Sequence, residues 1–487
     1  MKKMFLKYAA CCFILLLLIV PDIYAKPKME LLTTGIPISI TQRHEWHPWV
    51  EYNSVDKEFM VLTNISGSLD GTGTISYHSL NAQRVSVDGE LLGDQIEISP
   101  PEGLNEFVTW KSMPKLAYNN FSNEYMVAYM IGYTYNNPFY PYGPPAMWAY
   151  YNVIERVRIN NVGEVQGDGP VALWPTLWNA SHTAIAFNSQ RQEYLVVYDD
   201  KYIFTNDTNI YDQPGFILDA EGNVISGNPI GNPIMVDYGP GSHFSPYVVY
   251  NPIDDTYMLN WEDFRHVPPG QSWMYGPFDI YGSILDGEGN IIVDPVVNVD
   301  DTGQPDEGKS QTVPSIAHNP VDNEFLVAWT DSRPSLNGGG VIGRLINGDG
   351  TPKGLDFVIA DGPGSQGAPK MVYVKTMRKY FVVWQDSRYY TPPPGAPSYA
   401  RVYDIFAQWL NPDGTPASEE IEIYVGPGSQ TMPMLAYSPY MQRFLIAWRD
   451  ENAPGDFTPV GPGAPMAPEI KADVRGALYG KPTGKLK

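Results

Sequence analysis

The chain has 487 residues and is strongly acidic, because 54 Asp and Glu stand against 32 Lys and Arg and give a formal net charge of −22 at pH 7. A surface of this sign repels phosphate backbones and anionic lipids, so we expect no nucleic acid and no anionic membrane among its partners. The two cysteines are adjacent, at Cys11 and Cys12, and 45 Gly and 45 Pro interrupt the rest of the sequence.

Residues 1–25 have the pattern of a secretory signal peptide. Three early lysines precede an apolar run over residues 9–20, and Ile23–Ala25 offers a cleavage site. Removing this segment, with its three Lys and one Asp, takes the net charge from −22 to about −24. It also removes both cysteines, which excludes disulfides, covalent haem attachment and thiolate zinc sites. We therefore predict a secreted or periplasmic protein, cleaved near Ala25, without haem and without membrane insertion.

After the leader, one pattern recurs seven times: an apolar run, a turn residue, then a second apolar run, which ends in Trp or Tyr in six of the copies. The fifth copy reads Pro314–Asn319 followed by Glu324–Asp331. Consecutive turn residues are 55 to 69 positions apart, at Asn53, Asn119, Asn188, Asn251, Asn319, Val374 and Ser438. A period of this length, built of short strands between turns, is typical of propeller blades.

Each copy divides into four predicted strands, a to d. In copy four, strand c is Asp279–Leu285, and the acidic glycine turn Asp286–Gly289 follows it, as a tight hairpin requires. The last copy ends after strand c, at Ala472–Leu478, while an unassigned strand-like segment lies near Leu31–Thr41. We predict an all-β fold, a seven-bladed β-propeller forming one domain over residues 26–487, in which the N-terminal strand completes the last blade. An array of β-sandwiches is the alternative.

The segments between strands b and c are rich in proline and aromatic residues in several copies. Proline stiffens a loop, and aromatic rings with polar tips suit the faces of sugars or the hot spots of protein interfaces. We therefore predict binding roles for Tyr140, Trp148, Trp273, Tyr389 and Tyr399. The alternative is that these loops only pack on one another.

A second candidate site follows from the residue eight positions before each turn residue, which we expect at the mouth of the central channel. Three copies carry Gln there, for which capping of backbone groups is the simpler role. Three others carry titratable side chains, and a position where repeats diverge is where a specific site can arise. The predicted binding residues at this position are Glu45, Lys111, His243, Gln311, Gln366 and Gln430.

Strand b ends in Trp-x-Asp-x-Arg in copies four, five and six, with the aspartates at Asp263, Asp331 and Asp386. Because the motif recurs, we interpret it as a structural ion pair rather than a catalytic group. The sequence predicts no metal site: His44 and His47 lack the helical spacing of zinc proteases, and the acidic glycine turns lack the full ligand spacing of an EF-hand. We expect no cofactor, and a structural calcium ion stays open.

The Trp-x-Asp-x-Arg motif and the Asp279–Leu285 pattern, Asp-Ile-Tyr-Gly-x-x-Leu, resemble repeats of secreted bacterial β-propeller proteins. The Ser-x-Asp-x-Gly-x-Thr-Trp box of sialidases is missing. Two hypotheses follow. In the first, a non-enzymatic binding or scaffolding propeller engages a protein or polysaccharide outside the cytoplasm through the aromatic loops. In the second, a carbohydrate-active enzyme uses carboxylates near the channel, where Glu45 is the one acid that the sequence places.

Overall fold

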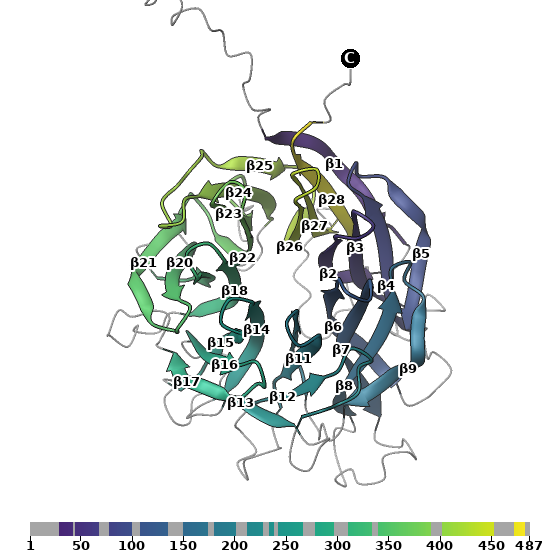
Figure 1. Ribbon diagram of the computed structural model, residues 1–487. Helices are drawn as coiled ribbons and strands as arrows, with labels where there is room; N and C mark the ends of the chain where they lie inside the picture. The colour runs from purple at the N-terminus through teal and green to yellow at the C-terminus, as the bar shows by residue number, and fades with distance from the viewer. Residues whose placement is uncertain are drawn as a thin grey trace, which may run out of the picture.

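In a computed structural model of the chain, seven four-stranded antiparallel sheets stand around a central axis as the blades of a β-propeller (Figure 1). The predicted fold class is therefore confirmed. The structure describes residues 29–41, 44–67, 77–99, 108–134, 150–173, 180–200, 212–226, 233–237, 242–265, 278–296, 310–333, 339–390, 402–451 and 472–482. The predicted signal peptide lies outside these residues. The described part contains no helix long and apolar enough to cross a membrane.

The first four blades follow the chain in order. Blade 1 comprises β2 (His44–Asn53), β3 (Glu58–Gly67), β4 (Tyr77–Ser86) and β5 (Leu91–Ser99). Blade 2 comprises β6 (Val108–Asn119), β7 (Glu124–Thr134), β8 (Tyr150–Asn160) and β9 (Val165–Leu173). Blade 3 comprises β10 (Thr183–Asn188), β11 (Glu193–Tyr198), β12 (Gln213–Leu218) and β13 (Ile234–Asp237). Blade 4 comprises β14 (His243–Asn251), β15 (Thr256–Asp263), β16 (Asp279–Asp286) and β17 (Ile291–Val296).

The last three blades complete the ring. Blade 5 comprises β18 (Gln311–Asn319), β19 (Glu324–Asp331), β20 (Gly340–Asn347) and β21 (Pro352–Ala360). Blade 6 comprises β22 (Gln366–Val374), β23 (Lys379–Asp386), β24 (Asp404–Leu410) and β25 (Ile421–Tyr424). Blade 7 comprises β26 (Ser429–Ser438), β27 (Arg443–Glu451), β28 (Ala472–Gly480) and the N-terminal strand β1 (Glu30–Ser39).

The two ends of the described chain close the ring. β1 pairs antiparallel with β28, so that Glu30 lies opposite Gly480 and Ser39 opposite Val474. The two strands lie side by side where purple meets yellow in Figure 1. The N-terminal strand thus supplies the fourth strand of blade 7 and closes the ring, as the sequence predicted.

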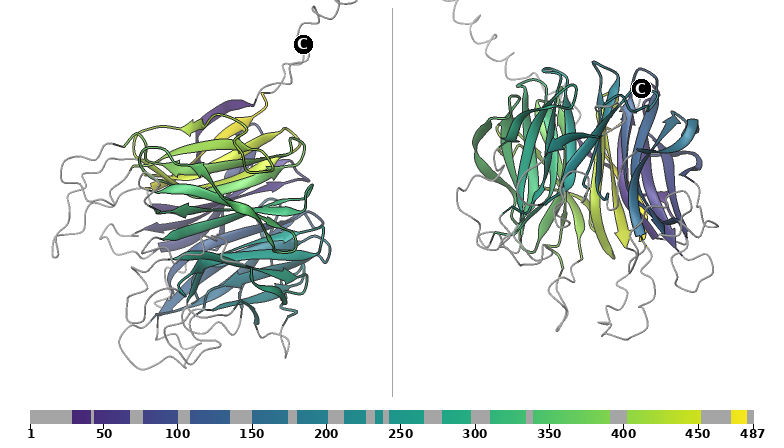
Figure 2. Two further views of the ribbon diagram at one scale, coloured as in Figure 1. Left: turned by 90° about the vertical axis from the view of Figure 1, so that its left-hand side faces the viewer. Right: turned by 90° about the horizontal axis from the view of Figure 1, so that it is seen from below.

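The core lies between neighbouring blades rather than in the middle of the ring. Figure 2 shows the blades edge-on, with their sheets facing one another. Blade 5 contributes Leu326 and Ala328, for example, to a cluster that continues through Tyr380, Val382 and Trp384 of blade 6. The motif tryptophans are among the largest fully buried side chains. Each interface buries apolar side chains from two sheets, which stabilises the ring as a whole.

The turn residue that defines the repeat also links the blades. The side chain of Asn53 accepts hydrogen bonds from the backbone N–H groups of Val55 and Asp56 at 2.9 and 2.8 Å, which shapes the turn between strands a and b. Its amide also donates to Asn123 of the next blade at 2.8 Å. The same arrangement recurs in blade 4, where Asn251 donates to Asn323 at 2.9 Å.

Candidate functional site

The three predicted glutamines lie at the start of strand a, where the structure buries them. Gln430 donates to the carbonyl of Pro427 at 3.0 Å and to Asp450 at 2.9 Å. Gln366 makes the equivalent contacts with Pro363 and Asp386. The side-chain oxygen of Gln311 accepts the N–H of Ile280 at 3.2 Å. All three are at most 1% exposed. Each therefore binds groups within the protein, and a role in ligand binding stays a prediction.

The three titratable residues of this set are also enclosed, at most 1% exposed. Lys111 donates to the hydroxyl of Ser99 at 2.6 Å, and His243 lies 3.3 Å from the carboxylate of Asp263. Glu45 accepts the backbone N–H groups of Thr41 and Val474 at 2.9 and 3.1 Å. Burial raises the pKa of Glu45 to about 7. The structure holds each residue inside the ring and does not bring the three together, so their predicted binding role rests on the sequence alone.

Of the five predicted aromatic binding residues, the structure describes Tyr389, which is 56% exposed. Its hydroxyl donates to Glu422 at 2.6 Å, and its ring centroid lies 6.0 Å from that of Phe406. The guanidinium of Arg388 covers the same Phe406 ring at 4.1 Å. These groups form a small aromatic and polar platform beside the point where strand b of blade 6 ends. Tyr140, Trp148, Trp273 and Tyr399 lie outside the described residues.

The Trp-x-Asp-x-Arg motif forms a compact network within each blade that carries it. In blade 5, the indole N–H of Trp329 donates to Asp331 at 3.1 Å, and the guanidinium of Arg333 lies 2.8 Å from the same carboxylate. Arg333 also reaches Asp356 on β21 at 2.7 Å. The network therefore connects strand b with the outermost strand d. In blade 7, where the motif arginine is replaced, Arg475 of β28 pairs with Asp450 at 2.8 Å.

The innermost strands are distorted at one repeated position. In six blades, a residue of strand a has a positive φ of 48 to 55° and precedes a proline, and the strand pairing shifts there: His47, Met113, Ser245, Val313, Ala368 and Met432. A non-glycine residue in this conformation is strained and marks a β-bulge. At the bulge, the backbone N–H of Val313 donates a hydrogen bond to the carboxylate of Glu262 in the preceding blade at 2.7 Å. The bulge residues and several of their prolines line a cavity in the central channel.

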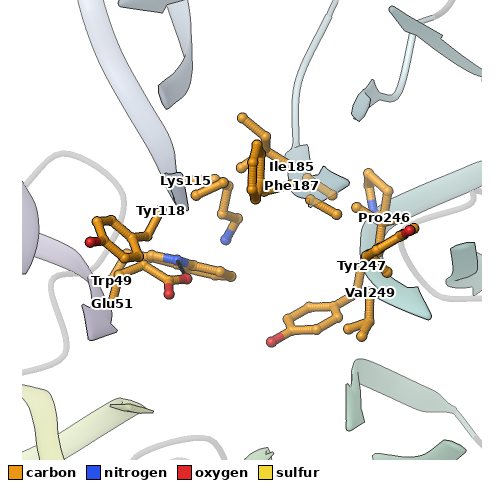
Figure 3. A pocket seen from close by; sticks show the side chains of 14 residues that line it. Trp49, Glu51, Lys115, Tyr118, Ile185, Phe187, Pro246, Tyr247 and Val249 are labelled. Carbon is orange, nitrogen blue, oxygen red and sulfur yellow. Dashed lines mark hydrogen bonds between the residues drawn. The ribbon is translucent and has the colours of Figure 1, made fainter. Parts of the chain in front are cut away.

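The channel contains two adjoining cavities. One, of about 220 Å³, is lined by strand a residues of all seven blades, including Lys370, and by Glu262 of strand b. The other, of about 280 Å³, is lined by residues of blades 1 to 4. Trp49, Lys115 and Tyr247 line both cavities. Figure 3 shows Trp49 and Tyr247 reaching toward one another from opposite sides of the second cavity, with ring centroids 6.1 Å apart.

Two lysines place their ammonium groups over these aromatic rings. The Nζ of Lys115 lies 4.3 Å from the centroid of Trp49, and the Nζ of Lys370 lies 4.8 Å from that of Tyr247. Removal from water lowers the pKa of Lys115 to about 8. The same effect, with repulsion from Lys115, lowers the pKa of Lys370 to about 7. The aromatic faces offset part of the cost of holding two positive charges away from bulk water.

The acidic and imidazole groups of the channel complete its electrostatics. Burial alone would lower the pKa of His182, but the carboxylate of Asp199 at 3.0 Å outweighs it, so that the pKa of His182 is raised. Burial lowers the pKa of His47 to about 4 and leaves it neutral at pH 7. Burial raises the pKa values of Glu262 and Glu51, the latter to about 7. No group of three or more His, Cys, Asp or Glu in the described ranges is placed to hold a metal ion.

Sequence reasoning did not single out these channel residues because it compared the repeats at a different position. Trp49, Lys115, Tyr247 and Lys370 all stand four positions before their turn residues, not eight. The residue four positions before the turn varies among the blades as strongly as the residue eight positions before it. In the three remaining blades it is Ala184, Ser315 and Met434. Comparing the repeats column by column along strand a is the signal that would have found them.

Comparison with known proteins adds no family. No protein-family model matches the sequence, and no curated protein does. Among solved structures, the chain is similar to a protein of unknown function from Dyadobacter fermentans, at 10% identity and a TM-score of 0.48 over 77% of this chain and 96% of that one. It is also similar to the NanB sialidase from Streptococcus pneumoniae, at 9% identity and a TM-score of 0.43, over 94% of this chain and 71% of that one. The Dos1 propeller is similar at 9% identity and a TM-score of 0.43, over 93% of this chain and 95% of that one. These values carry no conclusion about activity, and what is established is the seven-bladed β-propeller fold.

Proposed function

We propose that this protein is a non-enzymatic binding or scaffolding propeller that works outside the cytoplasm. Its partner, a protein or a polysaccharide, is engaged at the end of the ring where strands b lead into strands c. The observation that carries this proposal is the platform of Tyr389, Arg388 and Phe406. An exposed tyrosine, oriented by its hydrogen bond to Glu422, presents a ring face that needs little further ordering when a partner binds.

The acid that an enzyme was expected to use is poorly placed for catalysis. Glu45 is fully enclosed and accepts two backbone N–H groups. Asp473, whose charge contributes to the raised pKa of Glu45, is itself 2% exposed. A glycosidase needs two carboxyl groups that flank the bond to be cleaved. These two could reach a sugar only if the surrounding strands opened.

The alternative of a carbohydrate-active enzyme keeps one specific observation in its favour. Glu262 lines the first channel cavity and Glu51 the second, and burial raises both pKa values. A carboxyl group with a raised pKa is suited to donate a proton near neutral pH. Release of reducing sugar from any glycan, lost on Glu262→Gln or Glu51→Gln, would establish this alternative in place of the binding propeller.

Thermal unfolding of the purified protein with a panel of soluble polysaccharides tests the proposal. A glycan at a hundred times its dissociation constant stabilises the folded state by about 2.7 kcal/mol, enough to raise the melting temperature measurably. We expect Tyr389→Ala to reduce this shift. Tyr440→Ala is the matched control, because Tyr440 is 60% exposed but lies just after β26, at the opposite end of the ring.

The outcomes separate the two partner classes. A glycan shift that Tyr389→Ala reduces and Tyr440→Ala leaves intact supports a polysaccharide partner. If no glycan acts, a protein partner retained by the wild type but not by Tyr389→Ala supports the same face. Equal behaviour of both variants toward every partner contradicts the proposal.

A further inference from the structure

We propose that the central channel binds a small organic carboxylate between the ammonium groups of Lys115 and Lys370. This site is distinct from the platform around Tyr389, so the inference goes beyond the function proposed above. It starts from the position of two positive charges inside a protein whose net charge is −22. The two lysines come from different blades, β6 and β22, and line the same cavity of about 220 Å³.

The two ammonium groups belong to half-buried lysines and lack the carboxylate partner that charges shielded from water normally have. Among the described residues, neither Lys115 nor Lys370 forms an ion pair with a carboxylate. An aromatic face lies beside each ammonium group, and the charge of Glu262 acts on Lys370 from a greater distance than an ion pair. Other basic residues of the ring are paired: Arg333, for example, has two carboxylates within 2.8 Å. Buried charges are normally paired because an unpaired one is costly. A bound anion between the two lysines would supply the missing partner.

The remaining groups of the cavity limit what kind of anion fits. Its walls are largely apolar, with Met113, Met432 and Met434 beside the bulge prolines. A volume of about 220 Å³ is below the range of about 300 to 1,000 Å³ for sites that hold drug-sized ligands, so the ligand must be small. Glu262 lines the same cavity and disfavours a multiply charged anion such as phosphate. A singly charged carboxylate on a compact organic body satisfies all three conditions.

Anion binding should be linked to proton uptake. A negative charge between two lysines favours their charged forms, so it raises both pKa values from about 8 and about 7. The other titratable groups that line the two channel cavities are His47, His182, Glu262, Glu51, Tyr118, Tyr247 and Tyr250. Because an anion also favours the protonated form of each of these groups, none of them releases protons on binding. At pH 8, where Lys370 is largely neutral, the complex therefore takes up protons.

Isothermal titration calorimetry on the purified protein at low ionic strength tests the assignment, with the singly charged carboxylates galacturonate and N-acetylneuraminate as probes. Galactose is the neutral control, and inorganic phosphate is the competing anion. We expect at least one carboxylate to bind, with net proton uptake at pH 8 shown by titrations in buffers of different ionisation enthalpy. Lys115→Met and Lys370→Met should each weaken binding at least tenfold.

A matched control separates the site from general charge effects. Lys57 also stacks on an aromatic ring, with its Nζ 4.2 Å from the centroid of Tyr440, but at the turn between β2 and β3. Lys57→Met should bind as the wild type does. Melting curves show whether the channel variants fold, which we expect, because methionine removes a desolvated charge and keeps the side-chain volume. Binding by phosphate alone, by no carboxylate, or equally by all variants would overturn the proposal.

Discussion

The buried Asp331 offers the sharpest test of how the blades are held together. It is fully enclosed and accepts hydrogen bonds from the indole of Trp329 at 3.1 Å and from the N–H and side chain of Arg333 at 2.8 and 2.9 Å. Asp331→Ala leaves the indole and the guanidinium without this acceptor. Removing one partner of a buried ion pair costs about 3 to 5 kcal/mol. Arg333 is 17% exposed and keeps Asp356, so we expect a loss at the lower end, about 3 kcal/mol.

Asp356→Ala is the matched control, because it removes the other carboxylate of the same arginine. Asp356 is 19% exposed, and Arg333 keeps the buried Asp331, so the expected loss is about 1 kcal/mol or less. A difference of about 2 kcal/mol corresponds to a change of about 30-fold in the ratio of folded to unfolded protein. Urea unfolding followed by tryptophan fluorescence measures both losses, provided that the denaturant slope is unchanged. Equal losses in the two variants would refute the reasoning that burial decides the contribution.

Two further predictions concern ring closure and pH. Ile38 of β1 is 2% exposed, so Ile38→Ala should cost about 2 to 5 kcal/mol of stability in urea unfolding, whereas Leu31→Ala, at 39% exposure, should cost less than about 1 kcal/mol. A similar loss of stability in both variants would mean that packing of β1 does not stabilise the last blade. Because the folded protein raises the pKa of Glu45 from 4.5 to about 7, it binds more protons than the unfolded chain between these values, and stability falls as the pH rises through them. Glu45→Gln should flatten this pH dependence, and an unchanged profile from pH 4.5 to 7 would count against a raised pKa.

The repeat was predictable because each copy carries its own local signals. Asn53 and its equivalents form turns through their side chains, and Asp-Gly pairs such as Asp286–Gly287 close the hairpins between strands c and d. The last repeat has only three predicted strands, and a strand-like segment precedes the first repeat, so we predicted that this segment completes the last blade. β1 pairs with β28 as expected. These features depend on short stretches of sequence, which is why one sequence was sufficient to infer them.

The channel was not predictable in the same way, because it depends on a distortion of strand a. Regular alternation along a strand assigns every second side chain to one face. The bulge before Pro48, Pro314 and the equivalent prolines inserts one residue into the count and shifts the pairing, so that alternation cannot be carried across it. Glu45 and Gln311 precede the bulge and are enclosed, whereas Trp49 follows it and lines the channel. The repeated proline is visible in the sequence, but the positive φ before it is not.

The two proposed sites differ in how the acidic surface should affect them. At physiological ionic strength, charges separated by more than about 8 Å in solvent are largely screened. The net charge of −22 therefore repels acidic partners from an exposed platform such as that of Tyr389 mainly at low ionic strength, where screening is weak. In the channel cavity, Lys115 and Lys370 are the nearest positive charges to a bound ligand, so they can attract an anion that the net charge of the protein repels. An acidic propeller can in this way combine a face that discriminates against acidic macromolecules with an interior that accepts a small carboxylate.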